Sequence, residues 1–380
     1  MDAEVAIVGC GPAGGIAAKV LSEKGFSVLA IDRKKKIGYP IQCGEAISAA
    51  GLKNNGIKIS SEWLKKKHKG GKIFVPNGKF FLSLVNFLSI DRAKFDQSLI
   101  KEAVDNGCKL FLRTNVSKVK KKNEIWLVRT NRGILKSKIL IGADGSESNV
   151  AKQIGVLKHK EVIRAIQYKF RDLDFLDDGF LYMYLNEKFK NGYAWVFPRG
   201  DEFNVGVGGI GNIKLWLDKF CKKMGFKMEK RKSVGGGLLP KKIILESFEK
   251  SSALIVGDAA GLTNPLFGGG IHAALFSGRL AAETICKSLE LGDLSRLKEY
   301  DRKIKNSSFT SPLLHKVSEI FYSLKNEEYN FIGEVFNGKN WKNVSYFNIF
   351  KKFLIKPKFF LKLIDFWTLK RGIELSERLV

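Results

Sequence analysis

The feature that most constrains the fold of this chain is a glycine-rich turn at residues 9–14, which read GCGPAG. It follows an apolar stretch that predicts a buried strand, and it opens a helix that we expect to end near Gly25. A second predicted strand ends at Asp32, whose carboxylate can accept hydrogen bonds from ribose hydroxyls. Glycines at such a turn let the backbone approach a pyrophosphate at the helix N-terminus. The sequence therefore predicts a βαβ unit that binds a dinucleotide.

Two later segments resemble motifs of the p-hydroxybenzoate-hydroxylase-like flavoproteins. Residues 141–146 read IGADGS, similar to the DG motif of that family, and residues 257–260 read GDAA, similar to its GD motif; GGGI follows at residues 268–271. The resemblance implies FAD and a glutathione-reductase-like Rossmann domain. In such a site Asp258 can hold a ribityl hydroxyl, and the helix after the glycines can stabilise reduced, anionic flavin. Asp144 is equally well explained as a helix cap.

Further motifs resemble the geranylgeranyl reductases, archaeal enzymes that saturate the isoprenoid chains of membrane lipids. Residues 193–198 read YAWVFP and precede GVG, similar to the YxWxFP…GxG pattern of that family. Residues 39–45 (YPIQCGE) and 91–96 (DRAKFD) are similar to its Cys-Gly-Glu segment and its DRxxFD motif. The resemblance extends to about Ala282. The chain departs from it at Asp32, where the family usually has Glu, and at Ala151, where an Arg often stands.

The resemblance also implies which residues contact FAD. We expect the phosphate-binding turn to use Gly9, Gly11, Ala13 and Gly14, with further contacts from Asp32, Arg33, Cys43, Gly44, Ala46, Arg92, Val116, Asp258, Gly270 and Ile271. Arg92 could neutralise a phosphate through two parallel hydrogen bonds, and a surface ion pair is the other interpretation.

Three aromatic residues, Tyr193, Trp195 and Phe197, alternate along one predicted strand, so their rings project from the same face of a sheet. We expect them to line an apolar pocket for the substrate; packing in an ordinary sheet core is the alternative. The proton donor is left unassigned among Tyr193, Cys43 and water. Cys43 is equally well explained as a residue that packs against the flavin.

The expected reaction, by resemblance, is FAD-dependent saturation of isolated C=C bonds in the geranylgeranyl chains of archaeal-type phospholipids, by a hydride from reduced FAD and a proton. Three other functions stay open: an aromatic-ring monooxygenase with the same FAD motifs, a reductase of isoprenoid-quinone tails, and a membrane-docked flavin electron carrier. The sequence holds no second GxGxxG motif for a bound nicotinamide. Ferredoxin, a nicotinamide and a deazaflavin are therefore all candidate electron donors.

The net charge of +28 comes mostly from lysine. Solvated faces explain it, and an anionic membrane surface is a further candidate partner, whereas no motif supports binding to nucleic acid. The five cysteines and four histidines lack metal-ligand spacing, so we expect no metal site. No apolar run reaches the roughly 18 residues that span a bilayer. We therefore expect a cytoplasmic protein, peripheral on the inner face of the membrane.

The order of predicted strands and helices indicates a mixed α/β chain with interleaved domains. We expect an FAD-binding Rossmann domain formed by residues 1–60, 88–160 and 250–295, an antiparallel β-sheet substrate domain formed by residues 61–87 and 161–249, and a helical C-terminal region at residues 296–380.

In the tail, apolar residues from Phe347 to Leu354, and again from Phe359 to Trp367, form stripes beside lysines, and Pro357 breaks the helix between them. The stripes predict either docking on an anionic membrane or packing against the enzyme.

Overall fold

The computed structural model describes residues 1–171, 175, 177–355 and 363–379, and it contains an eight-stranded sheet near the N-terminus. In order, this sheet consists of β17 (Glu249–Lys250), β18 (Ala253–Ile255), β11 (Gly133–Gly142), β1 (Ala3–Val8), β2 (Val28–Ile31) and β8 (Lys109–Phe111), with β10 (Ile125–Thr130) paired to β11 and β9 (Val116–Lys122) paired to β10. β1 lies parallel to β11 and to β2, as a Rossmann-type sheet requires.

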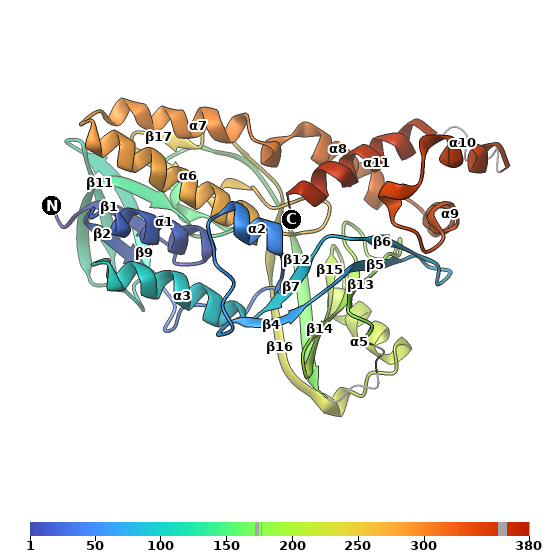
Figure 1. Ribbon diagram of the computed structural model, residues 1–380. Helices are drawn as coiled ribbons and strands as arrows, with labels where there is room; N and C mark the ends of the chain where they lie inside the picture. Colours follow the sequence, from blue (N-terminus) through green and yellow to red (C-terminus); the bar gives the residue numbers. More distant parts are fainter. Residues whose placement is uncertain (172–174, 176, 356–362, 380) are drawn as a thin grey trace.

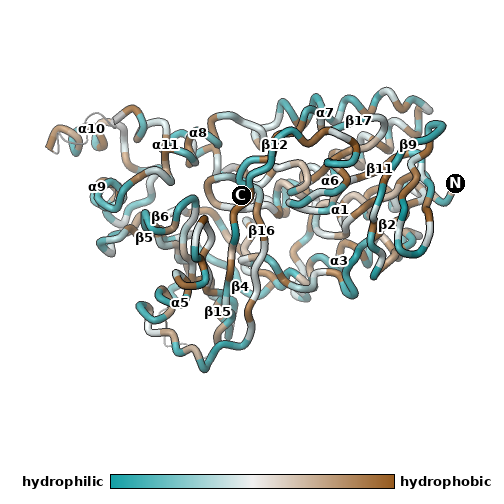
Figure 2. Tube along the Cα trace, turned by 180° about the vertical axis from the view of Figure 1, so that it is seen from behind, coloured by the Kyte–Doolittle hydropathy of each residue, from teal (hydrophilic) through white to brown (hydrophobic). Residues whose placement is uncertain are grey.

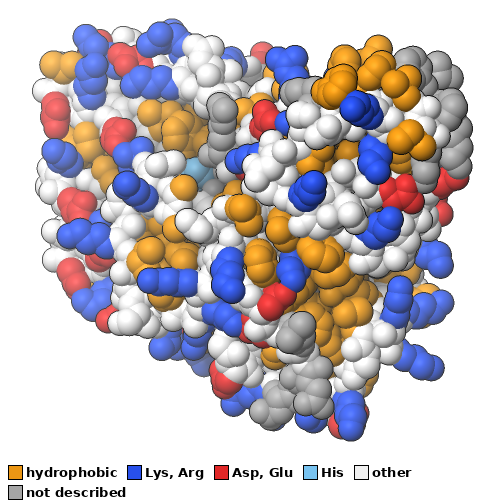
Figure 3. All heavy atoms as spheres, turned by 45° about the vertical axis from the view of Figure 1, so that its right-hand side comes forward, with side chains coloured by type: hydrophobic (Ala, Val, Ile, Leu, Met, Phe, Trp, Pro, Cys, Tyr) orange, Lys and Arg blue, Asp and Glu red, His pale blue; other side chains and the backbone are white. Residues whose placement is uncertain are grey.

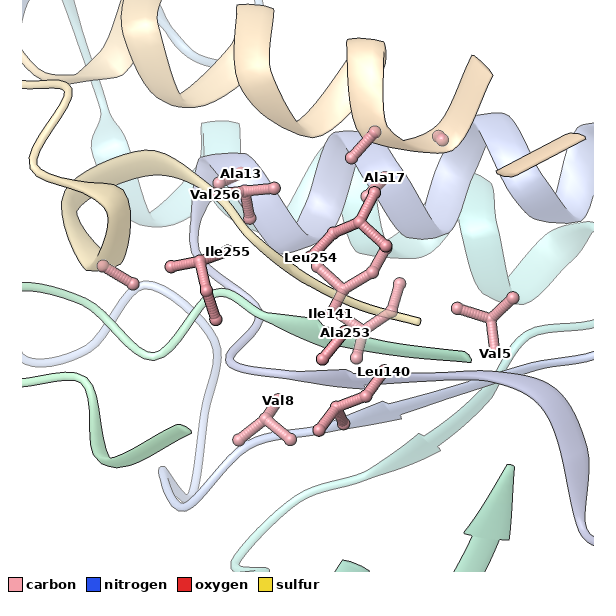
Figure 4. Packing of buried hydrophobic residues seen from close by; sticks show 14 of the residues in the cluster. Val5, Val8, Ala13, Ala17, Leu140, Ile141, Ala253, Leu254, Ile255 and Val256 are labelled. Carbon is pink, nitrogen blue, oxygen red and sulfur yellow. The ribbon is translucent and has the colours of Figure 1, made fainter. Parts of the chain in front are cut away.

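Helix α1 (Pro12–Glu23) lies between α6 (Ile271–Glu290) and α3 (Arg92–Asp105), as Figure 1 shows. α1 and α6 cross closely, because a Cβ on Gly278 would lie only 2.2 Å from the carbonyl oxygen of Ala13. Beneath these helices, aliphatic side chains of β1, β11 and β18 form a fully buried core (Figure 4). Apolar stretches thus follow the inner elements, whereas the outer helix α7 (Lys298–Lys305) is largely hydrophilic (Figure 2).

A second sheet has seven strands. In order, they are β16 (Arg231–Leu245), β12 (Leu157–Arg171), β15 (Glu202–Gly209), β14 (Ala194–Arg199), β13 (Phe180–Tyr184), β5 (Gly70–Phe74) and β6 (Phe80–Ser83). All neighbours are antiparallel except β13 and β5. The sequence analysis does not identify β16, whose three glycines and Pro240 mask its strand pattern. As an edge strand, β16 can accommodate a proline.

A three-stranded sheet joins the two larger ones. It consists of β3 (Ala46–Ser48), β7 (Phe87–Ile90) and β4 (Leu64–Lys67). Ser89 of β7 donates a hydrogen bond from Oγ to the carbonyl oxygen of Pro198 in β14 at 2.8 Å. Shorter helices include α2 (Ala49–Asn54), α4 (Asn149–Gln153), α5 (Ile213–Lys223) and the 3-10 helix η2 (Gly257–Ala260).

The C-terminal part of the chain is helical. It contains α8 (Pro312–Ser323), α9 (Asn326–Phe336), α10 (Tyr346–Ile355) and α11 (Leu363–Arg378), which pack beside β5 and β6 and return the C-terminus to the middle of the molecule (Figure 1). The expected fold class is therefore confirmed: a Rossmann-like α/β part with a second β-sheet and a helical C-terminal region.

The apolar stripe on α10 is divided between two environments. Ile349 and Phe353 are fully buried, whereas Phe347 and Leu354 are 65% and 57% exposed. The predicted break at Pro357 and the apolar residues that follow it, up to position 362, lie outside the described residues. Within the described part of the chain, no helix is both long enough and apolar enough to cross a membrane.

Candidate active site

The glycine turn after β1 can be approached closely by a phosphate. A Cβ on Gly14 would lie 1.9 Å from the carbonyl oxygen of Gly9, and one on Gly9 would lie 2.3 Å from that of Ala143, so both positions require glycine. Nothing lies within 4 Å of a Cβ placed on Gly11, which caps α1 without a side-chain hydrogen bond. Ala13 is buried against α6. Open space before an uncapped helix N-terminus fits the pyrophosphate of a dinucleotide.

The carboxylate of Asp32, at the end of β2, is held by the backbone. Oδ2 accepts a hydrogen bond from Cys10 N at 2.9 Å, and Oδ1 accepts one from Lys34 N at 2.8 Å. Arg33 is exposed beside it, and half-buried Val116 begins β9. None of these three residues lines the pocket described below, and their contact with FAD stays a prediction.

A second helix N-terminus, that of α6, lies at the pocket. Gly270 caps α6 without a side-chain hydrogen bond, and both Gly270 and Ile271 line the pocket. Oδ1 of Asp258 accepts a hydrogen bond from Thr263 Oγ1 at 2.9 Å and would lie 2.9 Å from a Cβ on Gly270. Burial raises the pKa of Asp258, against the opposite effects of Thr263 and Arg92. A buried carboxylate beside an uncapped helix fits the ribityl chain and ring of a flavin.

The loop at residues 43–46 brings Cys43, Gly44 and Ala46 to the same pocket. A Cβ on Gly44 would lie 3.3 Å from the ring of Phe197, so the loop packs directly on the seven-stranded sheet. The sulfur of Cys43 accepts a hydrogen bond from the backbone N–H of Glu45 at 3.2 Å.

Arg92 opens α3 and makes its two parallel hydrogen bonds with a protein carboxylate. Nε and Nη2 donate to Oδ1 and Oδ2 of Asp96 at 3.1 and 3.0 Å. Only 15% and 5% of the two side chains are exposed, so the pair is not the surface ion pair that the sequence allowed. Burial opposes the charge, but Asp96 and Cys43 outweigh it and raise the pKa of Arg92 above its ordinary value.

Glu45 holds the 43–46 loop through charges that the sequence analysis did not identify. It is fully buried with a φ of 64°, and Oε1 accepts hydrogen bonds from Arg199 Nη2 at 3.0 Å and from Arg92 N at 3.2 Å. Nζ of Lys169 lies 2.7 Å from Oε2. Removing one partner of such a buried ion pair leaves an uncompensated charge, which is strongly destabilising. The network therefore fixes the loop that faces the flavin site.

A cavity that is partly open to solvent lies between this loop, the start of α6 and the seven-stranded sheet. Three rings form a row along it: the centroids of Tyr193 and Trp195 are 5.9 Å apart, and those of Trp195 and Phe197 are 6.0 Å apart. Phe87, Ile163, Leu181, Met183 and Leu239 are among its other apolar residues. A large, mainly apolar pocket suits a long apolar ligand.

The C-terminal helix contributes a carboxylate to the pocket. Glu377 in α11 lines it and is 8% exposed. Oε1 accepts hydrogen bonds from Trp341 Nε1 at 2.8 Å and from Ser83 Oγ, and Lys342 Nζ lies 2.7 Å from Oε2. The sequence analysis assigned the tail no part in the pocket.

The structure brings eight of the predicted site residues together around this cavity. They are Cys43, Gly44, Ala46, Gly270, Ile271, Tyr193, Trp195 and Phe197. Asp144, by contrast, is a helix cap: its carboxylate accepts hydrogen bonds from Ser148 Oγ at 2.6 Å and from the N–H of Asn149 at 2.7 Å. Among the described residues, no group of His, Cys, Asp and Glu side chains could hold a metal ion.

Comparison with known proteins gives consistent matches. The model of a family described as an FAD binding domain matches residues 2–205. The digeranylgeranylglycerophospholipid reductase of Methanocaldococcus jannaschii is 30% identical over 94% of this chain and 96% of its own, and a second reductase of that name from Methanopyrus kandleri is 33% identical over 88% and 90%.

Solved structures agree with these matches. A geranylgeranyl bacteriochlorophyll reductase-like protein from Thermoplasma acidophilum superposes with a TM-score of 0.82 at 26% identity, covering 92% of this chain and 95% of that one. The flavin-dependent halogenase CmlS, at 20% identity and a TM-score of 0.68 over 85% and 65% of the two chains, shares the fold.

Proposed function

The chain belongs to the FAD-binding digeranylgeranylglycerophospholipid reductase family, and from that premise we propose that it saturates C=C bonds in the geranylgeranyl chains of archaeal-type phospholipids. It is an FAD-dependent oxidoreductase that acts on C=C bonds. The observation that carries the lipid assignment is the large apolar cavity that reaches from the 43–46 loop and the start of α6 along the aromatic row.

Bound reduced FAD supplies a hydride to one alkene carbon, and a proton added to the other completes the saturated bond. The protein's part is to hold an isolated alkene in a site that excludes water. The row of rings can form a dry wall, because the polar atoms of Tyr193 and Trp195 already make hydrogen bonds within the protein. Trp195 Nε1 donates to Asn204 Oδ1 at 3.0 Å, and the Tyr193 hydroxyl donates to the carbonyl oxygen of Phe267 at 2.6 Å.

We propose that the adenosine part of FAD binds near Asp32, Arg33 and Val116. Its pyrophosphate would bind at the turn formed by Gly9, Gly11, Ala13 and Gly14. The flavin ring would be flanked by Cys43, Gly44, Ala46, Gly270 and Ile271. In this arrangement Asp258 holds the ribityl chain, and Arg92 reaches the cofactor from its pair with Asp96. The close backbone packing and the two uncapped helix starts support the assignment.

For the proton, the geometry favours Cys43 or water over Tyr193. Burial raises the pKa of Tyr193, and its proton is engaged by a backbone carbonyl. Cys43 lines the pocket, and its sulfur accepts rather than donates the bond to Glu45 N. A Cys43→Ser variant that retains FAD but changes the pH dependence of lipid reduction supports Cys43 as donor; an unchanged profile leaves water.

Mass spectrometry tests the proposed reaction. Protein purified with its FAD, reduced anaerobically with dithionite and incubated with a digeranylgeranylglycerophospholipid should yield lipids heavier in steps of two hydrogens. Protein with oxidised FAD is the control and should leave the lipid unchanged. Oxygenated products would indicate a monooxygenase, and flavin turnover without any saturated lipid would indicate an electron carrier.

The electron donor is proposed to be a ferredoxin, a nicotinamide or a deazaflavin. Each can be mixed anaerobically with the oxidised protein while the absorbance of the bound FAD is followed. The donor that bleaches the flavin within the turnover time is the functional one.

We propose that α10 and α11 attach the protein to an anionic membrane surface, on the inner face in the cell. Ile355 and Ile364 are 72% and 75% exposed, and Lys351 and Lys352 are exposed beside them. Figure 3 shows hydrophobic and basic side chains together at this end of the molecule. Basic residues near an anionic bilayer contribute about 1 kcal/mol each, which gives reversible attachment.

Liposome co-sedimentation tests this attachment. Binding to anionic vesicles should fall with added salt and in a Lys351→Glu, Lys352→Glu double variant, while neutral vesicles should bind weakly in every case. Equal binding of the double variant and the parent protein would place the membrane contact elsewhere.

The domain division is kept as a proposal: residues 1–60, 88–160 and 250–295 for FAD, residues 61–87 and 161–249 for the substrate sheet, and residues 296–380 for the helical part. Sheet membership supports it, since β5, β6 and β12 to β16 form the seven-stranded sheet.

A further inference from the structure

The segment at residues 264–270, which leads into α6, is held by three side chains from outside it. Three consecutive carbonyl oxygens each accept one hydrogen bond. Pro265 O accepts from Ser318 Oγ at 2.8 Å, Leu266 O accepts from the Tyr322 hydroxyl at 2.5 Å, and Phe267 O accepts from the Tyr193 hydroxyl at 2.6 Å. Ser318 and Tyr322 belong to α8, whereas Tyr193 precedes β14. Helix α8 and the residue before β14 thus both donate hydrogen bonds to the loop at residues 264–270.

The loop is also tied internally and to α11. Asn264 Oδ1 accepts hydrogen bonds from Leu266 N at 3.0 Å and Phe267 N at 3.2 Å, and Asn264 Nδ2 donates to Ser376 Oγ at 2.7 Å. With both its carbonyls and its asparagine engaged, the backbone just before Gly270 has little freedom to shift. Gly270 caps α6, so these bonds fix where the helix begins.

The three side chains that hold the carbonyls also line the lipid pocket. Tyr193 and Tyr322 both line the cavity, and their hydroxyls donate to the loop. Burial raises the pKa of both phenols, so they remain neutral donors. Tyr193, Ser318 and Tyr322 therefore each line the lipid pocket and also bind the loop at residues 264–270.

We propose that Tyr322, Ser318 and Tyr193 are positioning residues for lipid reduction: by holding the carbonyls of residues 265–267 they set the start of α6 against the flavin. The inference rests on the proposed function. The N-terminus of a helix carries a partial positive charge that falls off within its first turn, so its stabilisation of reduced, anionic flavin depends on its position.

The test compares two tyrosines of the same helical region. Tyr322→Phe keeps the ring in the pocket wall and removes only the hydroxyl. The matched control is Tyr329→Phe, because the buried Tyr329 hydroxyl donates to the carbonyl oxygen of Phe321 at 2.7 Å and its ring does not line the pocket. For Ser318→Ala the control is Ser323→Ala, whose hydroxyl donates to Ile320 O in the same helix at 2.8 Å.

Two readouts on FAD-loaded protein separate positioning from simple stability. The midpoint potential of bound FAD, measured without lipid, should become more negative in Tyr322→Phe; a tenfold loss of preference for reduced over oxidised FAD corresponds to about 30 mV for a two-electron couple. Single-turnover reduction of a digeranylgeranylglycerophospholipid should slow at least tenfold. Both control variants should keep the parent potential and rate.

An unchanged potential and rate in Tyr322→Phe overturns the inference, and so does an equal shift in Tyr329→Phe. If Tyr322→Phe does not fold, Ser318→Ala against Ser323→Ala gives the same decision. If the parent protein reduces no lipid while Tyr322→Phe still shifts the potential, the proposed function fails and the positioning role stands.

Discussion

The FAD cleft and the lipid pocket are built by different means. The cleft is formed by backbone. At Gly9 and Gly14 other backbone atoms pack so closely that a Cβ would overlap them, and the helices α1 and α6 begin without a side-chain cap. The pocket is lined mainly by side chains of the seven-stranded sheet, α8 and α11, and is completed by the 43–46 loop and the segment that leads into α6. A site built of backbone tolerates few substitutions, whereas one built of side chains can change its ligand without changing the fold.

The largest expected effect is at the backbone site. Gly14→Val should cost more than about 3 kcal/mol, because the new side chain would overlap the carbonyl oxygen of Gly9. Gly11→Ala should cost about 1 kcal/mol or less, since its Cβ meets open space, yet it should lose FAD. Thermal melting and the FAD content after desalting measure the two effects. A Gly14→Val protein that melts like the parent would contradict the comparison.

At the pocket, Trp195→Ala should reduce lipid turnover at least tenfold while FAD stays bound. Its ring lies against Gly206 and opens onto the existing cavity, so truncation should cost less than the roughly 3–5 kcal/mol of a closed aromatic core. The control is Trp126→Ala, in the core of the eight-stranded sheet, which should show the full stability loss. Thermal melting of both variants, with and without lipid, shows whether Trp195 is a pocket residue or a core residue. An equal loss in the two would make Trp195 a core residue.

Asp258→Ala and Asp144→Ala should separate cofactor contact from structure. We expect the first to weaken FAD retention at least tenfold, because its buried carboxylate lies beside Gly270. The second should mainly lower stability, by about 1 kcal/mol, as loss of the cap on α4 does. Equilibrium dialysis of FAD, with melting of the FAD-free proteins, measures both. Equal FAD retention in the two variants would contradict the expectation that Asp258, and not Asp144, contacts the cofactor.

The effect that is smallest near neutral pH is expected at the joint between the regions, where His68 Nε2 lies 2.9 Å from Ser89 Oγ. Burial, with nearby Lys66, lowers the pKa of His68 to about 4. As the pH falls, the His68 imidazole is protonated in the unfolded chain before it is protonated in the folded one. The free energy of unfolding is therefore highest well above pH 6.5 and decreases as the pH drops toward 4, by about 1 kcal/mol at pH 6 and by at most about 3 kcal/mol.

Denaturant unfolding of His68→Gln between pH 4 and 7 tests this fall. The variant should lose part of the pH dependence, whereas His159→Gln, at an exposed position, should keep it. Identical pH profiles for the parent and His68→Gln would show that His68 does not contribute.

The sequence predicted the backbone-built region far better than the side-chain-built one. The turn at residues 9–14 and the helix that it opens are local, so their residues predict their geometry. The aromatic row follows from the alternation of a single strand. In these cases the physical cause lies within a few residues of the effect.

The remainder depends on contacts between distant parts of the chain. Glu45 meets Arg199 and Lys169 only where the 43–46 loop packs on the seven-stranded sheet, and nothing near residue 45 indicates those partners. Glu377 reaches the pocket because α11 turns back toward β6. The strand β16 is stabilised by its pairing along β12 and not by its own composition.

The strand pairing also sets an order of assembly during synthesis. β1 leaves the ribosome long before its neighbour β11, which pairs Ala3 with Ser137, and β11 in turn waits for Ile255. The hairpin of β14 and β15 closes over a few residues and can form while the N-terminal sheet is still incomplete. Since chains grow at about 5–20 residues per second, the nascent protein spends many seconds with one side of the apolar strand β1 unpaired, although β2 can already pair with its other side. We expect flavin capture to be a late event, possible only once the start of α6 has emerged, and cells short of flavin to accumulate a chain open to proteolysis.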